Sequence, residues 1–79
     1  MASSRIQKIL VLEDDKIQHF LIRKRLGFLF PELVLFFKSR PSEAVNFLKA
    51  NKVDLIILDL NLPEMSGWEL VDLFEEAFD

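Results

Sequence analysis

The sequence has no cysteine, only two glycines and no long hydrophobic run. The lack of cysteine excludes a disulfide framework and a zinc site with cysteine ligands. A helix that spans a bilayer needs about 18 or more apolar residues in succession, so we expect no membrane as a partner. The segment Met1 to Arg5 is too short and too polar for a signal peptide, which favours a cytoplasmic protein.

The chain also has little net charge. It carries 13 acidic and 10 basic residues, for a net charge of −3, which argues against nucleic acid as a partner. Its 79 residues form one domain or part of one and bury only a modest core, yet 51% of them are hydrophobic. Most aromatic side chains are expected to pack in that core; they include Phe28, Phe30, Phe36, Phe37 and Trp68.

Continuous apolar runs predict buried strands. The first run covers residues 9–12 and the second covers Val53 to Leu58, with a further β segment predicted at Leu33 to Phe37. A strand with one face in water would alternate between apolar and polar residues. The continuous runs therefore favour a parallel sheet that is covered on both faces.

A first helix is predicted over residues 16–26. Asp15 is its predicted N-cap and Gly27 its predicted stop. His19 and Arg23 fall at helical spacing on a narrow polar stripe. We therefore expect His19, which is the single histidine of the chain, to be solvated.

Two more helices complete the pattern. Pro41 is expected near the first position of the second helix. The third is predicted after Gly67, where Ser66 and Glu69 have the spacing of a capping box. The order β-α-β-α-β-α predicts an α/β fold with a parallel sheet and right-handed crossovers.

Both of the main predicted strands end on carboxylates. Glu13 and Asp14 follow the first strand, and Asp59 follows the strand Val53 to Leu58. If these strands are neighbours, their ends form an acidic pocket, which either takes up protons or binds a cation. Oxygen ligands favour Mg²⁺, and an Asp beside Mg²⁺ is also a possible nucleophile toward phosphorus.

Each of these acids also has a purely structural interpretation. Asp59 could cap a turn at the end of its strand. Glu13 and Asp14 could stabilise the start of the following helix through the helix dipole. Asp15 alone already meets that need, so the pair is better explained by metal binding.

Two segments resemble the receiver domain of two-component response regulators. They are ILVLEDD at residues 9–15 and LIILDLNLPEMSGWEL at residues 55–70. The shared pattern is an acidic pair after the first strand, then an Asp after the third strand that is followed by Pro-x-Met-x-Gly, here Pro63 to Gly67. Each part is modest alone, but their order and their place on the predicted elements make the resemblance specific.

The resemblance implies a flavodoxin-like fold with strand order 2-1-3 and a role in phosphorelay signalling. Asp59 resembles the phosphoacceptor. Glu13 and Asp14 resemble the acidic pair that holds Mg²⁺, together with Asp59 and the backbone carbonyl of Asn61. The partner implied is a sensor histidine kinase or a phosphotransfer protein that carries the phosphohistidine. Because such a module does not turn over an external substrate, we expect that the chain is not an enzyme.

Residues 1–79 are expected to form a partial receiver domain. The family has five strands and five helices, and this sequence ends after the third helix. The fourth and fifth strands would supply a Thr or Ser and a Lys to the site.

In the order 2-1-3 the strand Val53 to Leu58 lies at an edge and exposes its backbone. We expect two copies to pair there as a homodimer about a twofold axis.

Two alternative functions remain open. In the first, the chain is a non-catalytic fragment that folds or dimerises through the strand Val53 to Leu58. In the second, it is a phosphatase of the haloacid dehalogenase type, which also uses an Asp nucleophile with Mg²⁺. That motif has a second Asp two residues after the nucleophile, where this sequence has Asn61.

Overall fold

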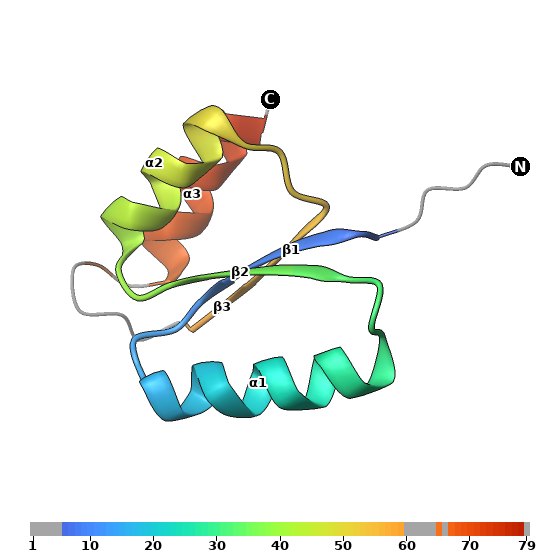
Figure 1. Cartoon of the computed structure of the whole chain (residues 1–79). Coiled ribbons are helices and arrows are strands. Elements are labelled where there is room, and N and C mark those ends of the chain that lie inside the picture. The colour runs from blue at the N-terminus through green and yellow to red at the C-terminus, as the bar shows by residue number, and fades with distance from the viewer. Residues whose placement is uncertain (1–5, 60–64, 66, 79) are drawn as a thin grey trace, which may run out of the picture.

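The computed structural model describes residues 6–59, 65 and 67–78. The described part forms three strands and three helices, which alternate along the chain (Figure 1). They are β1 (Lys8–Leu12), α1 (Lys16–Leu29), β2 (Val34–Lys38), α2 (Pro41–Ala50), β3 (Leu55–Leu58) and α3 (Gly67–Phe78). The strands are parallel and lie in the order β2-β1-β3, which confirms the predicted α/β fold. Within these residues no helix has the length and apolarity to cross a membrane.

The central strand β1 is the most buried element. Residues 9–12 are almost wholly inaccessible, and Leu10 pairs with Phe36 on β2 and with Ile56 on β3. Figure 1 shows α2 and α3 on one face of the sheet and α1 on the other. Because the side chains of β1 alternate between these faces, a continuous apolar run is what such a strand needs.

The main core lies between the sheet and the α2–α3 pair. Its buried members are Leu10, Leu12, Ala44, Leu70 and Phe74. Pro41 is the first residue of α2, as predicted, and the Glu43 carboxylate accepts the N–H groups of Ser39 and Arg40 at 3.2 Å. Ser66, half of the capping box predicted for the third helix, lies outside the described residues.

Helix α1 extends beyond its predicted stop. Asp15 caps its start as predicted, since one carboxylate oxygen accepts the N–H of Ile17 at 2.9 Å. Gly27, however, lies inside the helix, and the prediction that it ends the helix was wrong. The helix continues to Leu29 and stops before Pro31, whose ring disfavours a helical conformation at Phe30.

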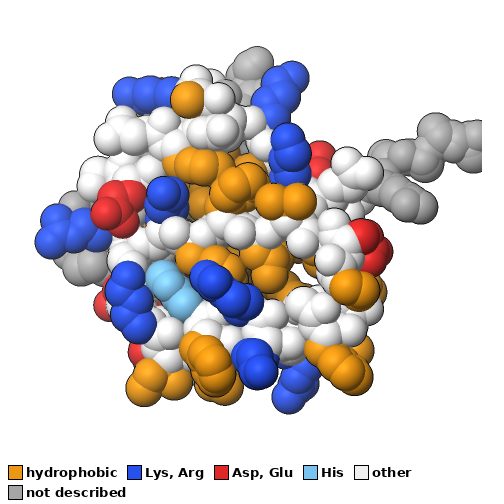
Figure 2. Space-filling model, viewed as in Figure 1, with side chains coloured by type: hydrophobic (Ala, Val, Ile, Leu, Met, Phe, Trp, Pro, Cys, Tyr) orange, Lys and Arg blue, Asp and Glu red, His pale blue; other side chains and the backbone are white. Residues whose placement is uncertain are grey.

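Several aromatic side chains predicted to be core residues lie on the surface. Phe28 is 83% exposed, and Phe30 and Trp68 are also exposed, whereas Phe36 and Phe37 are half-buried. Figure 2 shows hydrophobic side chains along the outer side of α1, interspersed with Lys and Arg. A helix that covers only a three-stranded sheet buries a narrow stripe, so most of α1 has nothing in the described structure to pack against.

Asp54 joins the starts of β1 and β3. One of its carboxylate oxygens accepts the N–H groups of Gln7 and Lys8, both at 2.9 Å. These hydrogen bonds lower the pKa of Asp54, with a smaller contribution from the Lys8 charge. The ionised carboxylate therefore stabilises the fold above the ordinary pKa of an Asp, and this stabilisation is lost as pH falls through the lowered pKa.

We expect Asp54→Asn to lower the urea midpoint of unfolding at pH 7, because the amide keeps an acceptor but loses the charge. The difference from wild type should shrink as the pH is lowered, since the wild-type carboxylate then takes up a proton as well. Asp72→Asn, which removes a charge from an exposed position of α3, is the control. If Asp54→Asn lowers the urea midpoint by the same amount at all pH values, the ionised carboxylate of Asp54 is not what stabilises the fold.

Candidate functional site

The site lies at the carboxyl ends of β1 and β3. The Asp59 N–H donates to the Leu12 carbonyl at 3.1 Å, and the Glu13 N–H donates to the Lys38 carbonyl at 3.0 Å. Hydrogen bonding between the strands therefore continues one residue past β1 and one past β3. This fixes the backbone positions of Glu13 and Asp59 before their side chains are considered.

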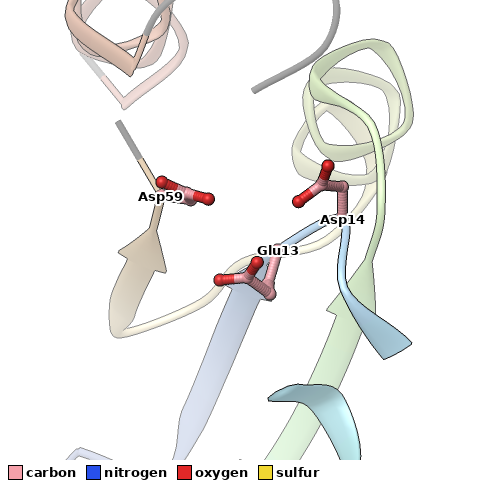
Figure 3. Close-up of side chains that lie close together, drawn as sticks. All are labelled: Glu13, Asp14 and Asp59. Atoms are coloured by element: carbon pink, nitrogen blue, oxygen red, sulfur yellow. The ribbon is translucent and has the colours of Figure 1, made fainter. Parts of the chain in front are cut away.

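Three carboxylates converge at this edge of the sheet. Glu13, Asp14 and Asp59 each offer one oxygen, and these three atoms all lie within 4.8 Å of one another. Figure 3 shows the three side chains facing a shared space at the ends of the two strands. Glu13 and Asp59 are half-buried and Asp14 is exposed. The structure thus brings together three of the residues singled out in the sequence.

The local electrostatics disfavour a full negative charge on Glu13. Partial burial raises the pKa of Glu13, and the charges of Asp59 and Asp14 raise it further, although a hydrogen bond from the Asp15 N–H opposes the change. Like charges this close repel, and a cation relieves the repulsion. The cluster is therefore a place where a positive charge would be bound favourably.

The donor set fits a hard divalent cation. It consists of carboxylate oxygens alone, two of them half-buried, which suits Mg²⁺ and leaves positions for water and a phosphate oxygen. The fourth predicted ligand, the backbone carbonyl of Asn61, lies outside the described residues. The roles of Glu13, Asp14 and Asp59 as ligands, and of Asp59 as phosphoacceptor, stay predictions.

One residue beside the cluster was misjudged from the sequence. His19, expected to be solvated, is 8% exposed, and its ring lies 5.1 Å from that of Phe37, centroid to centroid. Its Nε2 contacts the carbonyl oxygen of Glu13. The missed signal was spacing: His19 lies three and seven residues before Ile22 and Leu26, so all three share the stripe of α1 that faces the sheet.

The chain matches the family model of the response regulator receiver domain over residues 9–78. A search of curated proteins finds no match. Among solved structures, the chain is 28% identical to the signal receiver domain of a protein described as a Luxo repressor from Vibrio parahaemolyticus. The TM-score is 0.81, and the alignment covers 91% of this chain and 54% of that one.

Two further solved structures agree. The non-phosphorylated HemR receiver domain from Leptospira biflexa is 30% identical with a TM-score of 0.78, over 90% of this chain and 56% of that one. A CheY-like receiver domain from Methylobacillus flagellatus, 24% identical with a TM-score of 0.81, shows the same fold over 90% of this chain and 58% of that one. The flavodoxin-like fold is thus confirmed, and the chain spans about half the length of these receiver domains.

The family match overturns one expectation from the sequence, that the chain is not an enzyme. Receiver domains are phosphoacceptor modules. The side chains of such a site take part in a chemical step, because a carboxylate acts as the nucleophile in phosphoryl transfer. The categorical exclusion of enzymatic activity was therefore wrong.

We expect Glu13→Gln to stabilise the metal-free protein. Because the folded state holds a proton on Glu13 more tightly than the unfolded state does, ionisation of Glu13 costs stability as pH rises through its ordinary and then its raised pKa. Thermal unfolding in a chelating buffer should show a higher midpoint for Glu13→Gln at pH 7 and no gain at acid pH. Glu75→Gln, at an exposed position of α3, is the control. A lower midpoint for Glu13→Gln than for wild type in metal-free buffer would contradict the repulsion between Glu13 and the other two carboxylates.

Proposed function

Because the chain belongs to the response regulator receiver domain family, we propose that it is a phosphoacceptor module of a two-component signalling system. Asp59 is the residue that takes the phosphoryl group. One observation carries this proposal more than any other: the half-buried carboxylate of Asp59 lies at the end of β3, within 4.8 Å of an oxygen of Glu13 and one of Asp14.

Mg²⁺ is the cation that this site would hold. Glu13, Asp14 and Asp59 supply carboxylate oxygens. The backbone carbonyl of Asn61, which lies outside the described residues, is the fourth proposed ligand. Bound Mg²⁺ offsets the negative charge of the transferring phosphoryl group. Without a cation, three carboxylates would repel an anionic phosphodonor, so phosphorylation should depend on the metal.

The chemical step is a displacement at phosphorus. A carboxylate oxygen of Asp59 forms the new bond to phosphorus, while the bond from phosphorus to a histidine nitrogen of the donor breaks. The donor imidazole leaves with that electron pair. The donor in this proposal is a phosphohistidine on a sensor histidine kinase or a phosphotransfer protein. The product carries about −1.5 to −2 charges on its phosphoryl group, which alters the electrostatics of the loops around Asp59.

We also propose that residues 1–79 are the first part of a receiver domain and act in the cytoplasm. The chain spans about half the length of the solved receiver domains that it matches. Each of those domains has further chain beyond the matched segment. In the full receiver pattern that further chain provides a Thr or Ser and a Lys close to the phosphoryl group.

Phosphorylation can be tested with a small donor. We expect incubation with acetyl phosphate and Mg²⁺ to add the mass of one phosphoryl group, as read by intact-protein mass spectrometry. The gain should be lost in Asp59→Ala and in a chelating buffer, and it should persist in Asp72→Ala. No gain in wild type, or an equal gain in Asp59→Ala, would favour the alternative of a non-catalytic fragment.

The exposed side of β3 supports a second proposal, a homodimer through the strand Val53–Leu58. Within the described residues β3 pairs only with β1. Leu55 and Ile57 point to the face that α1 covers only partly, and Ile57 is 38% exposed. An unpaired, apolar edge is a template for another strand. Antiparallel pairing of two β3 strands about a twofold axis would give a continuous six-stranded sheet.

We expect wild type to sediment as a dimer at tens of micromolar in analytical ultracentrifugation. Ile57→Lys should shift it to the monomer, because a charge on the edge strand would be buried unpaired in the interface. Ile17→Lys is the matched control, since it makes the same change at a residue that is 67% exposed on α1 and is not part of β3. A monomeric wild type, or equal effects of the two substitutions, would rule out this interface.

A further inference from the structure

We infer that His19 is a positioning residue for the metal site, through its hydrogen bond to the carbonyl oxygen of Glu13. This inference rests on the proposed binding of Mg²⁺ by Glu13 and Asp14. His19 is not one of the residues of the carboxylate cluster. It acts on the backbone turn that carries two of them.

The direction of this hydrogen bond follows from its acceptor. A carbonyl oxygen only accepts, so Nε2 of His19 carries the hydrogen and donates it to Glu13. The backbone N–H of His19 also donates, at 3.1 Å, to the carbonyl of Asp15. The same residue therefore holds the turn between β1 and α1 at two points, one on each side of Asp14.

The Glu13 carbonyl is part of the peptide unit that links Glu13 to Asp14. On its other side, the Glu13 N–H is held by the Lys38 carbonyl at 3.0 Å. With both backbone groups of Glu13 bonded, the peptide plane between the two acids cannot turn freely. The directions in which the Glu13 and Asp14 side chains leave the backbone are fixed together.

The imidazole is itself held in place by aromatic packing. Its ring lies 5.1 Å from the Phe37 ring and is tilted by 42° to it, and the Arg23 guanidinium lies 4.6 Å from the centroid of that same Phe37 ring. The imidazole therefore lies between α1, which carries His19, and Phe37 of β2. His19 is the one polar or charged residue that is buried in the described structure, and its ring is anchored on β2 while its nitrogen reaches the turn after β1.

This arrangement opposes the repulsion at the site. Repulsion between three close carboxylates favours separation of the turn that carries Glu13 and Asp14 from Asp59, and a bound cation removes that repulsion. A turn that is held in the binding geometry beforehand loses less conformational freedom when the ion arrives. Groups that orient metal ligands without touching the metal typically contribute about 10- to 100-fold in affinity.

The test compares two substitutions of similar size. His19→Phe keeps a ring against Phe37 and loses the donor, whereas His19→Gln keeps an N–H donor at similar reach. Calorimetric titration with Mg²⁺ alone should show affinity about tenfold weaker for His19→Phe. His19→Gln should recover most of that loss. Phe37→Leu, which weakens the packing and leaves the donor in place, should weaken Mg²⁺ binding less than His19→Phe does.

The outcomes separate this inference from the proposed function. If wild type does not bind Mg²⁺, the metal site itself is wrong. If wild type binds and His19→Phe binds equally well, or if His19→Gln is as weak as His19→Phe, the positioning role is refuted. Circular dichroism of each variant establishes folding, and where His19→Phe does not fold, His19→Leu against His19→Gln makes the same comparison.

Discussion

Repulsion between three carboxylates at one edge of the sheet is the constraint that organises this molecule. The oxygens of Glu13, Asp14 and Asp59 lie within 4.8 Å of one another, an arrangement that the backbone must maintain against their charge. The structure does so by burying β1 almost completely, by continuing the interstrand hydrogen bonds to Glu13 and Asp59, and by bonding the turn after β1 to His19.

Patterns that depend on neighbours in sequence were predicted well. The continuous apolar runs indicated the strands, but only β1 is buried on both faces, whereas β3 leaves Leu55 and Ile57 exposed. The acids after two of those runs indicated a shared edge, because parallel strands end on the same side of a sheet. The cap at Asp15 and the position of Pro41 follow the same logic. Each of these features can be predicted from a few consecutive residues, because the interaction that forms it is local in sequence.

Features that depend on distant partners were missed. His19 is buried because its ring packs against Phe37 and its Nε2 donates a hydrogen bond to the Glu13 carbonyl. Neither partner can be inferred from the sequence of the helix alone. The sequence predicts that Gly27 ends the first helix, but a glycine in a helical conformation is tolerated, and Pro31 ends the helix instead. Phe28 and Trp68 were assigned to a core by type, whereas the described structure offers them no surface to pack against.

At the amino ends of β1 and β3, a carboxylate is stabilised by hydrogen-bond donors instead of being repelled by other carboxylates. There a single carboxylate, Asp54, is matched by the N–H groups of Gln7 and Lys8, and its own N–H bonds the Lys8 carbonyl at 2.8 Å. These hydrogen bonds fix the register of β1 and β3 at the end of the pair opposite the carboxylate cluster, and they oppose sliding of one strand along the other. A charge placed at the cluster would therefore act on a sheet whose two strands are held in register at the opposite end.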